Sequence, residues 1–376
     1  MPEQLKKIFF STSSINEIGD TIKRFYPDFD KNKFVELIFD EGWESMELKE
    51  KMRHTTQCLH KTLPESYKEA LGILKKAAPF VKGFEAMSLP DFVELYGMEM
   101  ENWDLSLRAL GYFTRYASSE FAIRPFLDRD LERTLVYMQT WAEDESPRVR
   151  RLASEGCRPR LPWAMALPKF KKDPGPILPI LEKLKGDPSE DVRRSVANNL
   201  NDISKDNPEW MLDICEKWYG QSKNTDAIIK HACRTMLKAG NKRALMIFGF
   251  CDPTHIKVEN FKIDKDMVKI GEDIRFSFDL IIDEKEKSKV RLEYVVYFMK
   301  ANGKSSKKVF QITENEYVPG KHSFKRKHSF VDMSTRKHNP GEHRVSIIIN
   351  GEEKATASLE LTPRREEPIC TALKFS

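Results

Sequence analysis

The middle of the chain contains one carboxylate surrounded by arginines. The stretch 147–172 holds eight basic residues and a single acidic one, Glu155, with Arg151 one helical turn before it and Arg158 and Arg160 after it. A carboxylate among several guanidinium groups is expected to stay ionised, and such a group can stabilise a developing positive charge. We interpret Glu155 as a surface acid of a basic groove, although a structural salt bridge inside a basic loop explains the same residues equally well.

A second carboxylate, Glu120, lies in the segment 118–126, in which Pro125 marks the end or the start of a helix. We therefore expect Glu120 at a corner between helices, facing the same groove as Glu155. Two carboxylates with aromatic neighbours in an otherwise basic groove suit a flat, positively charged ligand that is held next to a phosphate chain.

An internal repeat sets basic residues at a fixed period. DESPRVRRLASEGC at 144–157 aligns with DPSEDVRRSVANNL at 187–200, an offset of 43 residues that is typical of HEAT-type helix pairs. A weaker third copy at 226–240 places Lys230 where the second copy has Arg194. We expect Arg151, Arg194 and Lys230 to project from successive inner helices at roughly 10 Å intervals, a spacing that suits a phosphate backbone. The alternative is ordinary, since arginines of such repeats often pair with an aspartate of the neighbouring repeat.

The elements that position these residues change character along the chain. Up to about residue 252 the apolar residues recur at helical spacing, and after residue 253 they alternate with polar ones, as in Ile274, Phe276, Phe278 and Leu280. Asn302-Gly303 and Asn350-Gly351 are strong signals for tight hairpins. We predict an all-α HEAT-like repeat solenoid at 1–252, a C-terminal all-β Ig-like sandwich of about seven strands at 253–363, and a poorly ordered tail at 364–376.

Composition excludes several classes of protein. The 376 residues include 63 basic and 58 acidic ones, and the whole excess of +5 falls within 253–376. The sequence has no apolar run long enough to span a membrane and no signal peptide at its N-terminus. Six scattered cysteines without a C-x-x-C pair indicate a reduced, cytoplasmic chain, and dispersed histidines indicate neither a metal site nor a cofactor.

Three segments of the sequence resemble one known family. SSEFAIRPFL at 118–127, RRLASEGCRPRLPWA at 150–164 and VRRSVANNLNDISKDNP at 192–208 closely resemble the AlkC family of bacterial DNA alkylation-repair glycosylases, which shares the HEAT-like-repeat superfamily with AlkD. The resemblance covers essentially the whole chain, including the strand-rich part, which is Ig-like in many members of the family.

This resemblance implies an activity and a partner. It implies a monofunctional DNA-3-methyladenine glycosylase that acts on double-stranded DNA containing alkylated bases, with 3-methylcytosine or 1-methyladenine as further substrates. A methylated base that already carries a positive charge is a good leaving group, so the protein has mainly to stabilise the oxocarbenium-like sugar and position a water molecule. No metal, no cofactor, no membrane and no obligate protein partner is implied, and we expect a monomer in the bacterial cytoplasm, bound to the nucleoid through DNA.

The resemblance also assigns residues. Glu155 would support the sugar cation, Glu120 would be the second catalytic carboxylate, and Trp163 and Phe121 would contact the base. The residues expected to bind DNA are Arg148, Arg151, Arg158, Arg160, Arg194, Asn198, Asn199 and Lys230, together with Arg336, Lys337 and His338 in a sandwich loop turned by Pro340-Gly341. Glu155 stands where the next repeat has Asn198, an exchange for which a repeat used only for packing has no evident need.

Two other interpretations remain open at this point. The chain could be a non-catalytic HEAT-repeat scaffold, or a protein that binds damaged DNA through its phosphates without cutting it. The two glutamates argue against a pure DNA-binding groove, and the arginine row argues against a scaffold. The basic stretch 321–328 alternates like an exposed strand and can be explained as a solvated face.

Overall fold

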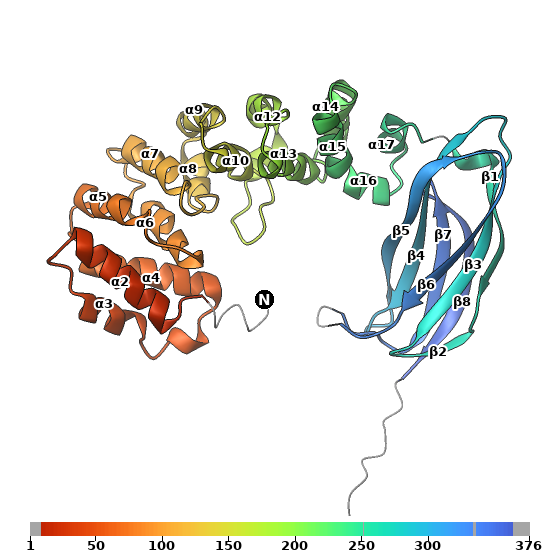
Figure 1. Ribbon diagram of the computed structural model, residues 1–376, viewed down its shortest axis with the longest axis horizontal. Coiled ribbons are helices and arrows are strands. Elements are labelled where there is room, and N and C mark those ends of the chain that lie inside the picture. The colour runs from red at the N-terminus through yellow and green to blue at the C-terminus, as the bar shows by residue number, and fades with distance from the viewer. Residues whose placement is uncertain (1–8, 251, 334–335, 364–376) are drawn as a thin grey trace, which may run out of the picture. The chain divides into compact units, whose positions relative to one another are not determined.

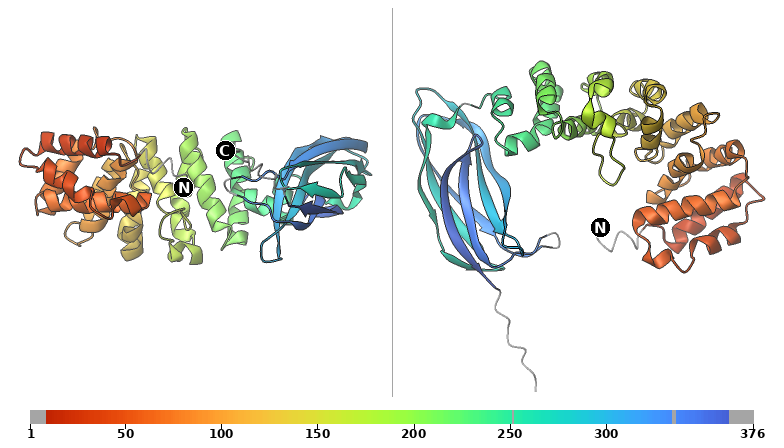
Figure 2. Two further views of the ribbon diagram at one scale, coloured as in Figure 1. Left: turned by 90° about the horizontal axis from the view of Figure 1, so that it is seen from below. Right: turned by 180° about the vertical axis from the view of Figure 1, so that it is seen from behind.

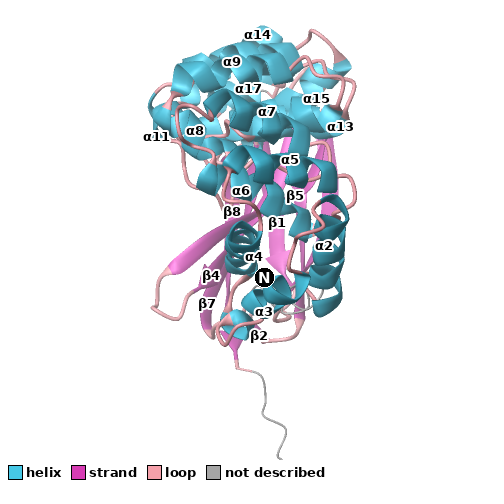
Figure 3. Cartoon of the chain, turned by 90° about the vertical axis from the view of Figure 1, so that its left-hand side faces the viewer, coloured by secondary structure: helices cyan, strands magenta, loops and turns pink. Residues whose placement is uncertain are grey.

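The protein consists of helices followed by strands. The computed structural model describes residues 9–250, 252–333 and 336–363; its last α-helix ends at Ile247 and its first strand begins at Ile256 (Figure 1). Figure 3 distinguishes the helices from the strands by colour. Within the described residues, no helix is long and apolar enough to cross a membrane.

The chain divides into two compact units, and the division falls between Ala232 and Cys233. The helical unit comprises the described residues up to 232, and the sandwich unit comprises those from 233 onward. We had placed the boundary at 252, where the apolar pattern changes, and that boundary stays a prediction. The tail predicted at 364–376 lies outside the described residues.

The helical unit is a curved row of short helices (Figures 1 and 2). Its α-helices are α2 Thr12–Phe25, α3 Lys31–Ile38, α4 Leu48–Thr62, α5 Tyr67–Ala77, α6 Ser88–Tyr96, α7 Trp103–Phe113, α8 Ile123–Arg129, α9 Leu131–Trp141, α10 Pro147–Glu155, α11 Pro168–Lys172, α12 Leu178–Leu184, α13 Glu190–Ile203, α14 Pro208–Trp218 and α15 Lys223–Ala232. Helix α10 packs against α13, and α13 packs against α15, while α9, α12 and α14 form the neighbouring row (Figure 1). The two predicted copies of the repeat therefore begin equivalent inner helices.

Each inner helix starts in the same way because its sequence repeats. Ser146 precedes α10 and Ser189 precedes α13, and in each case the serine backbone N–H donates to the aspartate two residues earlier, over 2.8 Å. The apolar residues Val149 and Val192 are buried at the same position of the two helices. Trp103 and Trp141 are also buried in the helical unit.

The described part of the sandwich unit contains two short α-helices, a 3-10 helix at Pro253–His255 and two sheets. The α-helices are α16 Arg234–Lys238 and α17 Lys242–Ile247, and the strands are β1 Ile256–Ile263, β2 Met267–Lys269, β3 Asp273–Ile282, β4 Ser288–Met299, β5 Ser305–Tyr317, β6 Gly320–Ser329, β7 Gly341–Ile349 and β8 Glu352–Thr362. One sheet has the order β1-β3-β6 and the other the order β2-β8-β7-β4-β5. The described residues thus form eight strands, one more than predicted.

Alternation along the strands builds the sandwich core. The four residues predicted from period two, Ile274, Phe276, Phe278 and Leu280, are all buried in that core. Both predicted hairpins are present, Asn302-Gly303 between β4 and β5 and Asn350-Gly351 between β7 and β8. Asn350 and Gly351 both adopt positive φ angles, of 46° and 83°, as a tight two-residue turn between twisted strands requires.

Two glycines bring helix and hairpin into backbone contact within this unit. A Cβ atom on Gly240, between α16 and α17, would lie 2.7 Å from the carbonyl oxygen of Gly351. A Cβ atom on Gly351 would lie 2.4 Å from the Cα atom of Gly240. Lys289 of β4 adds a hydrogen bond of 2.8 Å to the carbonyl of Phe248, just after α17. These contacts attach α16 and α17 to the five-stranded sheet.

Candidate active site

The two glutamates singled out from the sequence lie close together in the helical unit. Glu155 is the last residue of α10, and Glu120 lies three residues before α8 begins. A Cβ atom on Gly156 would lie 2.7 Å from Ile123 of α8, so this glycine lets the end of α10 approach the start of α8. The predicted pairing of the two carboxylates follows from this close approach.

Arg151 joins the two carboxylates. Its guanidinium lies 2.8 Å from Glu120 through Nη1 and 3.5 Å from Glu155 through Nη2. The hydroxyl of Ser118 also donates to Glu120, over 2.9 Å. The side chain of Arg151 is 34% exposed and that of Glu120 is 17% exposed, so both can be reached from solvent.

Glu155 is more deeply held than a surface acid, which corrects our interpretation. Its side chain is 6% exposed, because α13 packs over it. The Ser195 hydroxyl of α13 donates to Oε2 over 2.6 Å, and Arg158 donates to Oε1 over 2.6 Å. A carboxylate fixed at both oxygens has a defined orientation and needs little rearrangement when charge develops nearby.

Arg158 lies inside this network, whereas the sequence predicts that it binds DNA. Its Nε donates to Asp202 over 2.9 Å while its Nη1 holds Glu155, and its side chain is 9% exposed. Burial by itself would lower the pKa of Arg158, but the carboxylates of Glu155 and Asp202 outweigh it and raise that pKa above its ordinary value. Arg158 is therefore a buried partner of Glu155 in this structure, and it is not free to hold a phosphate.

The loop 156–167 carries Trp163 outward. Trp163 is 60% exposed, and its backbone has a φ of 63°, a left-handed conformation that is uncommon for large residues. Arg124 of α8 is fully buried and fixes the loop at two points, donating to the carbonyl of Gly156 over 3.0 Å and to that of Met165 over 2.6 Å. Burial lowers the pKa of Arg124 to about 10.

The paired arginines of the repeat divide into two kinds. The first of each pair, Arg150 or Arg193, turns back to the loop before its own helix and donates to backbone carbonyls there. Arg150 also makes an ion pair with Asp187 of the next repeat, over 2.6 Å. The ordinary explanation of the motif therefore applies to the first arginine. The second, Arg151 or Arg194, is the one left at the helix surface.

Farther along the row, Arg194 is one of the residues that line a small hollow. It measures about 290 Å³ and is lined by residues of α13 and α15: Glu190, Arg193, Arg194, Ala197, Asn224, Ala227, Ile228 and His231. Arg194 is 55% exposed and makes an ion pair with Glu190, one turn earlier, over 2.6 Å. His231 hydrogen-bonds the side chain of Asn198 over 3.0 Å, and Lys230 is half-buried on α15.

Three other expected DNA contacts have different surroundings. Asn199 is fully buried and donates to the carbonyl of Ser154 over 2.9 Å, so it fixes α13 to α10 and cannot meet a phosphate. Arg160 is exposed and makes a two-point ion pair with Asp206, over 2.6 and 2.8 Å. Arg148 is exposed and donates to the carbonyl of Arg115 over 3.2 Å.

The sandwich loop does not present its three basic residues together. Lys337 is exposed and Arg336 lies over the ring of Phe298 at 4.8 Å. His338 is buried, 8% exposed, between Phe298 and Phe330. The expectation that His338 contacts DNA is therefore wrong for this structure, because its ring completes the aromatic core of the sandwich.

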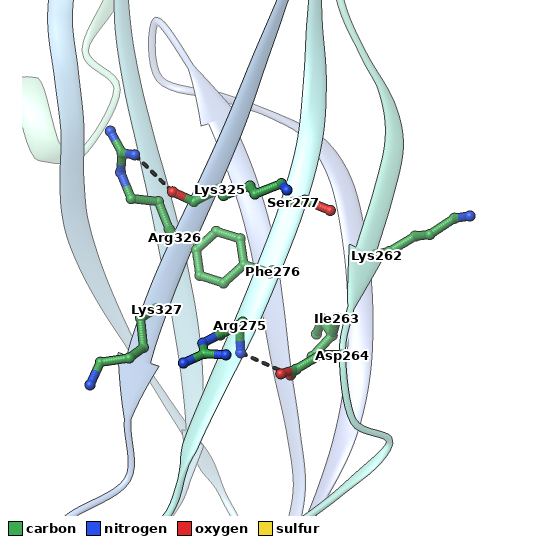
Figure 4. A pocket seen from close by; sticks show the side chains of 9 residues that line it. All are labelled: Lys262, Ile263, Asp264, Arg275, Phe276, Ser277, Lys325, Arg326 and Lys327. Carbon is green, nitrogen blue, oxygen red and sulfur yellow. Dashed lines mark hydrogen bonds between the residues drawn. The ribbon is translucent and has the colours of Figure 1, made fainter.

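Another hollow, of about 580 Å³, lies along the three strands of the smaller sheet (Figure 4). Its lining consists of Lys262, Ile263, Asp264, Arg275, Phe276, Ser277, Lys325, Arg326 and Lys327. Lys327 makes an ion pair with Asp273, and Lys321 with Asp279, each over 2.8 Å. Two of the lysines on this strand are thus neutralised within the sheet, which supports the interpretation of 321–328 as a solvated face.

The sequence alone did not reveal several residues of the carboxylate network. Ser195 and Asp202 were inside a quoted motif, but nothing in their spacing indicated that they meet Glu155 and Arg158. Lys49 of α4, which donates to the carbonyl of Trp163 over 2.6 Å, is 114 residues away in sequence. Among the described residues, no group of three or more histidine, cysteine, aspartate or glutamate side chains could hold a metal ion.

Known proteins resemble this chain in overall sequence and in fold. Residues 93–236 match a family described as a DNA alkylation repair enzyme, and residues 257–363 match the C-terminal Ig-like domain of the uncharacterised protein YhaZ. The YhaZ protein of Bacillus subtilis is 45% identical over 358 residues, which cover 95% of this chain and 99% of that protein. The solved structure of the Pseudomonas fluorescens alkylpurine DNA glycosylase AlkC, bound to DNA containing an abasic site analog, is 37% identical with a TM-score of 0.90, over 95% of this chain and 99% of that one.

The chain belongs to the AlkC family of DNA alkylation-repair glycosylases. Membership in the AlkC family confirms the resemblance drawn from the three sequence motifs and the predicted class of the fold. The match to the DNA alkylation repair family contains Glu120, Glu155 and Trp163 but leaves out the helices before residue 93.

Proposed function

We propose that this AlkC-type protein hydrolyses the N-glycosidic bond of cationic alkylated bases in duplex DNA, with 3-methyladenine as the first substrate and 3-methylcytosine or 1-methyladenine as others. The observation that carries the proposal is the pair of carboxylates joined through one half-exposed arginine, since Arg151 contacts both Glu120 and Glu155. A groove that only bound phosphates would gain nothing from two acids at this position.

Glu155 would stabilise the sugar. When the bond to a cationic base breaks, positive charge moves to the sugar ring, and a fixed, ionised carboxylate lowers the energy of that state. Ser195 and Arg158 hold Glu155 at both oxygens, so its position is set before DNA arrives. The same carboxylate can orient the water molecule that attacks the sugar.

Glu120 would meet the base. It is more exposed than Glu155, and an acid close to a positively charged base favours an alkylated base over a neutral one by simple charge attraction. The exposed indole of Trp163 offers a flat surface next to such a base, and a cation over an indole face is attracted to it.

Arg151 would exchange partners when DNA binds. Its guanidinium is held by Glu120 in the protein alone, but a backbone phosphate is a competing bidentate acceptor. Transfer of Arg151 to a phosphate would release Glu120 toward the base. Arg194 and Lys230 would hold further phosphates along the same row, and a single copy of the chain suffices for this arrangement.

The test is release of the base from a duplex that contains 3-methyladenine. We expect Glu155→Gln to lower the single-turnover rate roughly 10²- to 10³-fold and Glu120→Gln to lower it less. A matched control is Glu143→Gln, which removes a carboxylate that pairs with Lys183 on the protein surface. The strand should stay unbroken at the abasic product, as monofunctional chemistry requires. If the native chain binds the duplex but releases no base, it is a damage-binding protein and the proposal fails.

A further inference from the structure

Lys49 stands at an unusual place in its own helix. It is the second residue of α4, Leu48–Thr62, whose first turn is closed by a capping box of Glu47 and Glu50. A cation in the first turn is unfavourable because the backbone N–H groups there already present positive charge. The α4 helix itself therefore gives no reason for a lysine at this position.

The contacts of Lys49 lie instead on the two aromatic residues assigned to the base. Its ammonium group donates to the backbone carbonyl of Trp163 over 2.6 Å and lies 4.6 Å from the centre of the Phe121 ring. Phe121 directly follows Glu120. One side chain from α4 thus connects the loop that carries Trp163 with the segment that carries the second carboxylate.

The contact of Lys49 bears on the orientation of the exposed Trp163 side chain. Trp163 has a left-handed backbone and a largely exposed indole, so neither backbone preference nor burial fixes it. Arg124 fixes the loop at Gly156 and Met165, on either side of the tryptophan. The hydrogen bond from Lys49 is a polar contact at the tryptophan itself, and it sets the plane of the peptide bond that follows Trp163.

We propose that Lys49 is a positioning residue of the glycosylase site, which holds Trp163 and Phe121 at its rim. The helices before residue 93 lie outside the match to the DNA alkylation repair family, and through Lys49 they supply part of the site. The inference rests on the proposed function. It also changes the role of Phe121, because one face of its ring is occupied by the ammonium group and its task is to support Lys49.

The first test measures Trp163 directly, without reference to activity. Lys49→Met removes the donor and the charge but keeps the apolar stem, and Lys49→Arg restores a donor. Lys75→Met is the control, since Lys75 of α5 also lies over an aromatic ring, that of Tyr112, at 5.1 Å. The fluorescence anisotropy of Trp163 is obtained as the difference between each full-length protein and its Trp163→Phe derivative. We expect this anisotropy to fall in Lys49→Met and to stay near the native value in the other two.

The second test separates the chemical step from binding. With the 3-methyladenine duplex and saturating protein, Lys49→Met should lower the single-turnover rate roughly tenfold, the loss expected from one charge-assisted hydrogen bond, while the Kd for undamaged duplex stays the same. Lys49→Arg should recover most of the rate. A rate loss that Lys49→Arg does not recover would show a demand for lysine itself and would overturn the positioning role.

Two further outcomes would overturn the inference. Native anisotropy in Lys49→Met would show that Lys49 does not hold Trp163. Lower anisotropy with a native rate of base release would show that the contact exists but does not serve the site. If the native chain releases no base at all, the proposed function fails and the positioning role fails with it, while the anisotropy still decides whether the contact exists.

Discussion

Arg158 donates a 2.6 Å hydrogen bond to Glu155, and both side chains are buried. In the sequence these residues stand three positions apart in a basic stretch, where Arg158 looked like a phosphate ligand. In the structure Arg158 also holds Asp202, so it spans two repeats and fixes the carboxylate between them. The arginines of this region therefore form two groups: buried ones that position carboxylates, and exposed ones that can reach a phosphate.

We predict that Arg158→Ala destabilises the protein strongly. Removing one partner of a buried ion pair leaves uncompensated charge and costs about 3–5 kcal/mol, and here two carboxylates, Glu155 and Asp202, each lose their buried cationic partner. Urea unfolding followed by far-ultraviolet circular dichroism measures the loss. The comparison variant is Arg160→Ala, whose ion pair with Asp206 lies at the surface and should barely change the unfolding midpoint. Equal midpoints for the two variants would contradict the buried role of Arg158.

Arg151→Ala should weaken binding to duplex DNA of any sequence and make it less dependent on salt. Each phosphate contact contributes about one unit to the slope of log affinity against log salt concentration, so the slope should become shallower by that amount. Fluorescence anisotropy of a labelled duplex over a range of salt concentrations gives the slope. Lys33→Ala, at an exposed position of α3, also removes one positive charge and should leave the slope as it is. An unchanged slope in Arg151→Ala would mean that Arg151 only serves the two glutamates.

Trp163→Gly should separate stability from activity. Trp163 has a φ of 63° and is 60% exposed, so glycine relieves a backbone cost of about 1 kcal/mol and gives up little buried surface. We expect a melting temperature at or above the native one together with a large loss of base release. Trp163→Ala, which keeps the backbone cost, should lose activity to the same degree and be the less stable of the two. A clear drop in the melting temperature of Trp163→Gly would show that the indole is part of the core.

The stability of the sandwich should fall in mild acid. Burial lowers the pKa of His328 from 6.5 to about 4, and His338 adds to this effect. Because the unfolded chain takes up a proton on this residue near pH 6.5 and the folded chain does so only near pH 4, stability is present above pH 6.5. It is lost as the pH falls toward 4, at up to about 1.4 kcal/mol per pH unit. Urea unfolding of the full chain at several pH values tests this.

His328→Phe should flatten that pH dependence, since it removes the proton uptake while keeping a ring against Phe330 and Tyr294. The control removes an exposed histidine: His255→Gln should leave the pH dependence of stability as steep as in the native chain. If the slopes of His328→Phe and the native chain agree between pH 4 and 6.5, His328 does not take up its proton on unfolding.

The architecture could be predicted from the sequence because it rests on local periodicity. Helical spacing, the 43-residue repeat and the alternation in β3 each depend on neighbours in sequence, and the structure has the corresponding helices and strands. The proximity of Glu120 and Glu155 could also be predicted from the sequence, because both acids interrupt a basic or apolar pattern. Such interruptions are visible in a single sequence.

The partners of these acids could not be predicted in the same way. Whether an arginine faces a phosphate or a buried carboxylate depends on contacts between repeats, such as that between Arg158 and Asp202, which lie 44 residues apart. The same is true of Asn199, which looked like a surface amide but is covered by α10. His338 sits in a loop rich in polar residues, yet its ring fills a gap between two phenylalanines.

The contact between Gly240 and Gly351 determines where a stable fragment of the protein can begin. Because neither backbone leaves room for a side chain, the turn after α16 packs directly against the hairpin between β7 and β8. A fragment that begins at Pro253 would lack the turn after α16 and would expose the hairpin between β7 and β8. A graft of the sandwich onto another helical protein should therefore start at Cys233, with both short helices included, and should retain glycine at 240 and 351.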